Sequence, residues 1–166
     1  YQYLSEVSHW ADEIGNLDWA ACQDWMCEPF ILERTGKTIA DHQKLTTENF
    51  LFLRTRQPLV APVLQGWDIA DYMAHWRMYE RAGIDLLGEP TVGVGSVCRR
   101  QAMDEVAQIM AELWNSGLRI HAFGFKLTGL RKAAGYLASA DSLAWSFAGG
   151  GQHLFPAVLI STVPTA

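Results

Sequence analysis

Two aspartates stand just beyond short apolar runs, which makes them the first candidates for chemistry in this sequence. Asp141 follows the small residues 138–140, which leave a carboxylate little steric cover. That placement suits a nucleophile or a general base, and it equally suits the N-cap of a following helix. Asp24 lies beyond residues 17–22, where the alternative is a solvated loop aspartate. If both carboxylates reach one cleft, separate environments can divide the acid and nucleophile roles between them.

A second group of residues offers polar contacts to a flat ligand. Gln65 carries an amide that can donate and accept, and Gly66 beside it permits close approach; a simple turn is the alternative. Gly93, Gly95 and Ser96 form a turn whose backbone N–H groups could meet a ligand. Because a lone motif of this kind is a weak signal, glycines required by packing remain the competing explanation.

Basic residues and one histidine lie near the same apolar runs. Arg99 and Arg100 come just before a predicted helix, where an anion is also favoured, so they could contact a phosphate. A solvated arginine pair is the alternative. Lys126 could contact a phosphate or merely end a strand, and His121, inside an apolar run, is more typical of a core histidine whose bonds are satisfied.

These side chains need elements to position them, and the chain repeats one pattern. Short apolar runs end in polar or glycine-rich turns and lead into helical stretches. The runs are residues 17–22, 59–64, 91–94, 119–123 and 137–140. Helical periodicity covers residues 3–14, 38–54, 68–82, 102–115 and 129–136. This alternation is typical of βα units, whose parallel sheets carry chemistry at the carboxyl ends of the strands.

Local signals refine the elements. Pro62 cannot donate a ladder hydrogen bond, so it predicts an irregularity just before Gln65. We predict a loop around Pro29. Thr38 and Asp41 suit the N-terminus of the 38–54 helix. The positions predicted at helical spacing there are Ile39, His42, Leu45, Asn49, Phe52 and Leu53.

The composition fits a single globular domain. The chain has 166 residues, 49% of them apolar and 19% charged, with a net charge of -5. This acidic balance provides no broad electrostatic footprint for nucleic acid, although a local basic patch is compatible with it. Three cysteines match no zinc or disulfide framework, and no apolar stretch reaches the length of a membrane span. We therefore expect a cytoplasmic protein without membrane contact.

The two ends of the sequence differ from the rest. The chain starts at Tyr1 with a helix already under way, and residues 149–166 break the preceding pattern. We interpret the sequence as a piece of a longer protein. Residues 1–148 would form one α/β domain, and residues 149–166 an irregular tail that need not be native to the fold.

Five segments stand out when they are taken together: QDWMCEP (residues 23–29), PVLQGW (62–67), VGVGSVCRR (92–100), HAFGFK (121–126) and SADSLAWS (139–146). In this combination they resemble the tRNA-guanine transglycosylase superfamily, and most closely its actinobacterial and phage branch related to deazaguanine DNA transglycosylases. The resemblance covers residues 17–147, and the combination is far more specific than any single segment.

The resemblance implies a (β/α)₈ TIM barrel, of which this chain would supply about five βα units. It implies exchange of a guanine-type base in nucleic acid for a 7-deazaguanine. Asp141 would be the nucleophile that attacks the sugar, and Asp24 would recognise the base and act as general acid and base. Gln65 with Gly66, and the turn from Gly93 to Ser96, would bind the base.

Several family features have no match here. The usual zinc cluster, a second base-recognising aspartate and the arginines beyond the nucleophile are absent from the expected positions. No cofactor is identified from the sequence. These departures weaken a tRNA substrate and leave DNA or a free nucleoside open. The expected partners are DNA or tRNA and a 7-deazaguanine base, with a homodimer as one assembly to test.

Two other functions remain open on the sequence. The chain could be a non-catalytic paralogue or fragment that binds a nucleoside or base. It could also be an unrelated TIM-barrel hydrolase that uses Asp24 and Asp141 as acid and base, in which case it would release a base without an incoming one.

Overall fold

Helices and strands alternate along the chain as the repeated pattern predicts. The computed structural model describes residues 2–100, 103–142 and 160–161. The first half contains α1 (Gln2–Ile14), β1 (Ala20–Ala21), α2 (Pro29–Thr35), α3 (Ile39–Arg54), β2 (Val60–Ala61), β3 (Val63–Leu64) and α4 (Ile69–Arg81). The second half contains η1 (Leu86–Gly88), β4 (Val92–Val94), α5 (Asp104–Asn115), β5 (Ile120–Ala122), α6 (Leu127–Ala133), η2 (Ala134–Tyr136), β6 (Ser139–Ala140) and β7 (Ile160–Ser161).

The strands follow one another in space in the order of the sequence. β1 pairs with β2 in parallel, and β3, β4, β5 and β6 form a parallel sheet in that order. Their carboxyl ends therefore lie along one edge, where the sequence places its polar turns. The predicted α/β class with parallel strands is confirmed.

Pro62 divides one apolar run into two strands. Val60 pairs with Ala20 of β1, whereas Val63 pairs with Gly93 of β4. Pro62 has no N–H to donate, but its carbonyl oxygen accepts from the N–H of Gly93 at 2.9 Å. The irregularity predicted just before Gln65 is confirmed, and the run links the two sheets.

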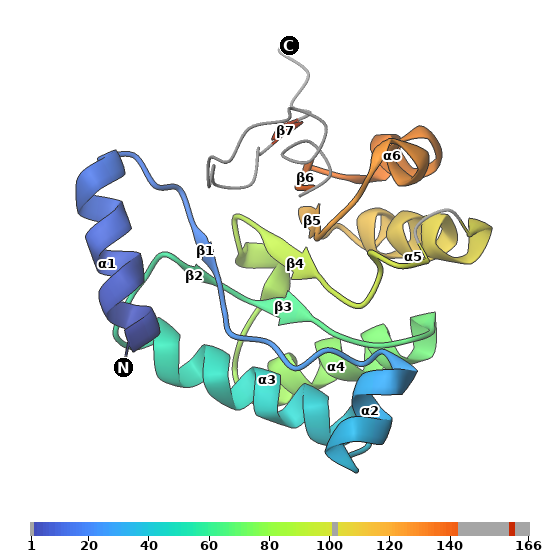
Figure 1. Cartoon of the computed structure of the whole chain (residues 1–166), viewed down its shortest axis with the longest axis horizontal. Helices are drawn as coiled ribbons and strands as arrows, with labels where there is room; N and C mark the ends of the chain where they lie inside the picture. Colours follow the sequence, from blue (N-terminus) through green and yellow to red (C-terminus); the bar gives the residue numbers. More distant parts are fainter. Residues whose placement is uncertain (1, 101–102, 143–159, 162–166) are drawn as a thin grey trace.

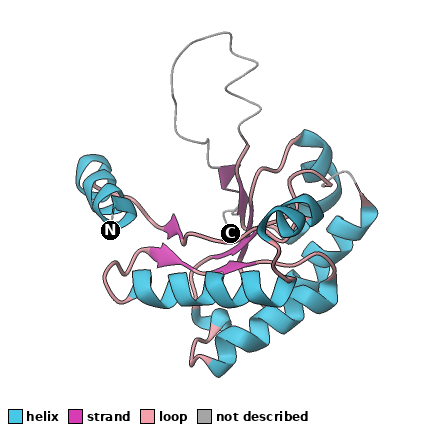
Figure 2. Cartoon of the chain, turned by 60° about the horizontal axis from the view of Figure 1, so that its bottom comes forward, coloured by secondary structure: helices cyan, strands magenta, loops and turns pink. Residues whose placement is uncertain are grey.

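Helices pack against the strands and bury a shared core. Figures 1 and 2 show the short strands in the middle, with α3, α4, α5 and α6 packed around them. The buried side chains of α5 are Val106, Ile109, Met110 and Leu113, which recur at helical spacing along the sequence. Strand residues such as Val63, Val94 and Ile120 are fully buried against them.

Helix α3 begins as predicted, and its buried face is largely polar. The Thr38 hydroxyl oxygen accepts from the Asp41 N–H at 3.1 Å, and the Asp41 carboxylate accepts from the Thr38 N–H at 3.0 Å. Phe52, one of the positions at helical spacing, is 41% exposed. The buried residues are His42, Gln43, Thr46, Thr47, Phe50 and Leu53. The face is largely polar because it packs against backbone groups that need hydrogen-bond partners.

The loop predicted around Pro29 is wrong in part, because residues 29–35 form helix α2. Pro29 occupies its first turn, and Gly36 ends it in the left-handed region with φ 63°. Proline at the start and glycine just past the end are typical helix boundaries. The strands β1 and β6 are also shorter than the apolar runs that predicted them.

Most of the predicted tail, residues 149–159 and 162–166, lies outside the described residues. The two described residues of this region form β7, which pairs antiparallel with β6, Ser161 opposite Ser139. Among the described residues, no helix is both long and apolar enough to cross a membrane.

Candidate active site

Polar residues gather where the parallel strands end. Gln65 directly follows β3, Ser96 lies two residues beyond β4, and Asp141 directly follows β6. The loop after β1 crosses the same edge, because Asp24 accepts a hydrogen bond from the Gln65 amide. The N–H of Cys27 in that loop donates to the Ser96 hydroxyl at 2.7 Å. Asp24, Gln65 and Ser96 are therefore one connected group.

Asp24 keeps exposed surface, yet its carboxyl group lies in a poorly hydrated environment. Desolvation is the largest influence and raises the pKa of Asp24, and the charge of Glu28 acts in the same direction. Hydrogen bonds from its own backbone and from Gln65 oppose this rise without cancelling it. The carboxyl group therefore retains a proton more readily than an ordinary aspartate, as a general acid requires.

Gln65 is completely enclosed by protein. Its side chain is 0% exposed, with Nε2 donating to Asp24 and Oε1 accepting from Ser96 Oγ at 2.6 Å. Its backbone N–H donates to His75 Nδ1 at 2.8 Å, and its carbonyl accepts from Gln43 Nε2 at 2.8 Å. Burial lowers the pKa of His75 to about 4, so its imidazole is neutral at pH 7 and can accept that bond.

The turn after β4 is shaped by packing against these groups. Ser96 has φ 58° and is the one non-glycine residue with positive φ among the described residues. A Cβ added at Gly95 would lie 2.1 Å from Gln65 Nε2, and one at Gly93 would lie 2.4 Å from the Phe123 ring. Both glycines are thus required by neighbouring side chains, which was the competing explanation for the motif.

The polar face of α3 holds the Asp24 loop in place. Thr46 Oγ1 accepts from the Trp25 N–H at 2.8 Å, and His42 Nδ1 lies 2.6 Å from the Met26 carbonyl oxygen. Asn49 Nδ2 donates to the Gln23 carbonyl at 2.8 Å. Sequence periodicity missed Thr46 as a core-facing residue, since polar side chains at helical spacing resemble a solvated face.

Asp141 has the opposite electrostatic setting from Asp24. Its Oδ1 accepts from the Gly124 N–H at 2.5 Å and lies 3.8 Å from Nε2 of the buried His121. His121 Nδ1 is in turn 2.8 Å from Ser139 Oγ. Desolvation acts to raise the pKa of Asp141, but the contacts with His121 and Gly124 outweigh it and leave the pKa below its ordinary value. An ionised carboxylate is the form that can attack carbon.

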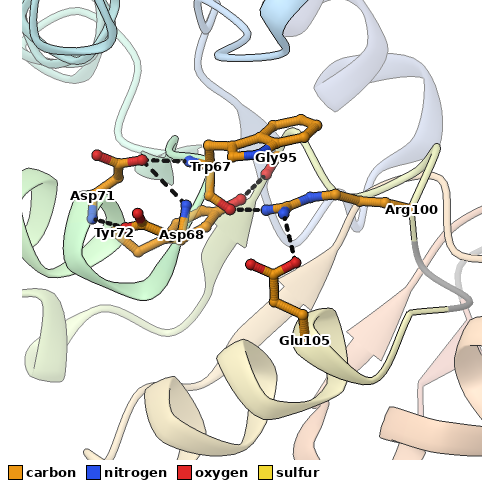
Figure 3. Close-up of polar contacts among 7 residues, drawn as sticks. All are labelled: Trp67, Asp68, Asp71, Tyr72, Gly95, Arg100 and Glu105. Carbon is orange, nitrogen blue, oxygen red and sulfur yellow. Dashed lines mark hydrogen bonds and ion pairs between the residues drawn. The ribbon is translucent and has the colours of Figure 1, made fainter.

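The three predicted phosphate-contacting residues have different surroundings. Arg100 is 5% exposed; it donates to the Trp67 carbonyl, lies 3.5 Å from Glu105 Oε2, and stacks 4.0 Å from the centre of the Trp67 ring (Figure 3). Arg99 has a side chain that is 70% exposed, and Lys126 is also exposed. Arg100 therefore ties the turns after β3 and β4 together, while the other two reach solvent.

Glu28 is a buried carboxylate that sequence reasoning missed. It is 3% exposed, and its Oε1 lies 3.9 Å from Cys98 Sγ and 4.0 Å from Arg99 Nε. Among the described residues, its Oε2 has no hydrogen-bond partner. No periodicity marks this position, because Glu28 belongs to a loop and caps α2 without a side-chain bond.

A zinc cluster is usual in the superfamily that the sequence motifs resemble. Within residues 2–100 and 103–142, no three His, Cys, Asp or Glu side chains come close enough to hold a metal ion. We assign no step of the chemistry to a metal.

Comparison with known families identifies the chain. The family DpdA, described as DeoxyPurine in DNA protein A, matches residues 1–159. The chain belongs to the DpdA family. No curated protein matches it. Membership in the DpdA family indicates a role in 7-deazaguanine modification of DNA, which agrees with the resemblance seen in the sequence motifs. Nucleic acid is accordingly the partner that the DpdA family implies.

Proposed function

We propose that the chain is a base-exchanging transglycosylase that replaces a guanine-type base in DNA with a 7-deazaguanine through a covalent aspartyl–glycosyl intermediate. The observation that carries this proposal is the pair of opposed pKa values at the strand ends. The pKa of Asp24 is raised and that of Asp141 is lowered. Two carboxyl groups whose pKa values are pushed apart are suited to separate acid and nucleophile roles.

The reaction then proceeds in two displacements. A carboxylate oxygen of Asp141 attacks C1′ of the nucleotide, the C1′–N9 bond breaks, and the leaving base takes the proton of Asp24 at nitrogen. In the second step Asp24 accepts the N9 proton of the incoming 7-deazaguanine. Its N9 forms a new bond to C1′, and the ester bond to Asp141 breaks. Both carboxyl groups return to their starting states.

The turns around the two carboxyl groups would hold the substrates. We propose that the base lies beside Asp24, near the turns that follow β3 and β4, whose glycines are themselves covered by Asp71, Phe123 and Gln65. We propose that Arg99 and Lys126, whose side chains are exposed, contact DNA phosphates. Arg100, which the sequence also suggested for a phosphate, would need to exchange its present carbonyl and Glu105 contacts to do so.

A partial (β/α)₈ barrel is part of the proposal. The strands β3, β4, β5 and β6 are adjacent in sequence order, as in a singly wound barrel. In a flat sheet, the ends of β3 and β6 would lie three strand spacings, or about 14 Å, apart. One nucleoside could not contact both ends at that distance. Barrel curvature brings such ends together. A homodimer and a cytoplasmic location likewise remain proposals.

The decisive experiment is transfer of a labelled 7-deazaguanine into guanine-containing duplex DNA, with tRNA as a parallel acceptor. We expect label in DNA, and a covalent protein–DNA adduct after acid quenching that Asp141→Asn abolishes. Asp104→Asn is the matched control, because Asp104 is an exposed aspartate paired with Lys132. Exchange that survives Asp141→Ala, or an absence of exchange, would refute the proposal. Release of a base without an incoming one would favour a hydrolase.

A further inference from the structure

We infer that Ser96 and Gln65 are positioning residues, which orient Asp24 so that its proton is carried on Oδ1, the oxygen that does not face Gln65. This inference rests on the proposed function for its catalytic meaning. It differs from the family-based expectation for Gln65, in which the amide of this glutamine contacts the base.

The direction of the hydrogen-bond chain is fixed at one end by a backbone donor. The N–H of Cys27 can only donate, so Ser96 Oγ must accept there, at 2.7 Å. The single hydroxyl hydrogen of Ser96 is then directed to Gln65 Oε1, at 2.6 Å. In this arrangement the Gln65 oxygen accepts from Ser96 and the Gln65 NH₂ group donates to Asp24.

The same logic determines where Asp24 can hold a proton. Asp24 Oδ2 accepts an N–H from Gln65, and the carbonyl oxygen of a protonated carboxyl group is a better acceptor than its hydroxyl oxygen. The Gln65 bond to Oδ2 therefore favours the proton on Oδ1. The chain therefore keeps the proton of Asp24 on one defined oxygen, which is the oxygen that must deliver it to the leaving base.

Gln65 has no remaining capacity for a base in this arrangement. Its side chain is 0% exposed, and both ends of its amide are engaged by Ser96 and Asp24. To read a base directly, Gln65 would have to give up a bond inside a buried network, which is costly.

The surrounding turn is built to maintain this orientation. Ser96 is held at φ 58°, a conformation that side chains other than glycine rarely adopt. The Tyr72 hydroxyl donates to the Gly95 carbonyl at 2.7 Å and fixes the preceding residue. Since a Cβ at Gly95 would overlap Gln65 Nε2, the absence of a side chain there makes room for the amide.

The test is the pH dependence of kcat/KM and the separate kcat and KM values of the exchange reaction in Gln65→Leu and Ser96→Ala. Loss of the Gln65 hydrogen bond removes an influence that lowers the pKa of Asp24. We expect the limb of the kcat/KM profile that reports the ionisation of Asp24 to move up by about one pH unit in Gln65→Leu. We expect kcat to fall about tenfold or more, with KM for the base changed less than about twofold. A raised KM with an unmoved limb would mean that Gln65 reads the base, and would overturn the inference.

Thr46→Val is the matched control for loop placement. Thr46 and Ser96 both accept a backbone N–H of the Asp24 loop, from Trp25 and Cys27 respectively, but only Ser96 touches Gln65. Thr46→Val should leave the limb in place, whereas Ser96→Ala should move it. The double variant of Ser96→Ala and Gln65→Leu should be no worse than Gln65→Leu alone, because both act through one chain. An equal shift in Thr46→Val, or additive effects, would count against the inference.

A measurement without turnover separates this inference from the proposed function. The carboxyl ¹³C signal of Asp24, assigned by its loss in Asp24→Asn, can be titrated in the whole chain. An upward shift of its titration midpoint in both Gln65→Leu and Ser96→Ala supports the hydrogen-bond chain even if the wild-type chain exchanges no base. An identical midpoint in all three proteins would refute it, whatever the activity.

Discussion

At the scale of single residues, identical side chains acquire opposite proton affinities from their neighbours. Asp24 is dehydrated and lies near the charge of Glu28, so its pKa rises. Asp141 is also dehydrated, but His121 and the Gly124 N–H stabilise its charged form more than burial opposes it. The balance between desolvation and stabilising contacts therefore separates the two roles.

His121 gives the first prediction at this scale. His121→Phe keeps a ring between Trp19 and Phe123, whose centroids each lie 4.8 Å away, but removes both nitrogens. We expect the pKa of Asp141 to rise, so that the rate of exchange declines on acidification from a higher pH than in the wild type. The pH profile of kcat measures this. Trp19→Phe is the control, because it alters the same packing and keeps the imidazole; an equal change there would contradict the prediction.

At the scale of elements, packing decides which turns can form and which face of a helix is buried. The α5 core face follows from apolar spacing, and all four of its buried residues are predictable. The α3 core face is not, because Gln43 and Thr46 are buried to bind backbone groups of other segments. Hydrophobic periodicity identifies a helix face that is buried through apolar side chains. It does not identify a face that is buried through polar side chains with hydrogen-bond partners.

The turn after β4 yields a prediction at the element scale. Gly95→Ala would place a Cβ 2.1 Å from Gln65 Nε2, so either the turn or the amide must move. We expect a loss of about 1–3 kcal/mol in the free energy of unfolding, typical of overpacking, measured by urea denaturation. Gly135→Ala is the matched control, since nothing lies within 4 Å of the added Cβ and its φ is not positive. Equal losses in the two variants would contradict this explanation.

At the scale of the whole molecule, the order of elements is readable from the sequence, whereas contacts between them are not. The repeated apolar runs predict parallel strands with their polar turns at one edge. The parallel pairing of β3 with β4, β4 with β5 and β5 with β6 confirms this. The bond between Asp24 and Gln65 joins residues 41 positions apart. No local pattern encodes such a contact, because it depends on how two loops meet after the sheet has formed.

The final prediction concerns the stability of the whole fold against acid. Burial lowers the pKa of His75 to about 4 from an ordinary value of 6.5. The contribution of neutral His75 to the free energy of unfolding is therefore fully present above pH 6.5. It is lost as the pH falls toward 4, by about 3 kcal/mol in all, because the unfolded chain binds the proton first. Asp24 has a raised pKa and acts in the opposite direction, since it binds a proton more readily in the folded state. His75 should dominate at the upper end of this window.

His75→Phe should accordingly flatten the dependence of unfolding free energy on pH between about 6.5 and 4. The variant will be less stable at pH 7, because the Gln65 N–H loses its acceptor, but the slope is the informative quantity. Urea denaturation at several pH values measures it, with Asp24→Asn to isolate the opposing aspartate. His9→Gln changes an exposed histidine and should retain the wild-type slope. If His75→Phe also retains that slope, the buried imidazole is not what couples the fold to pH.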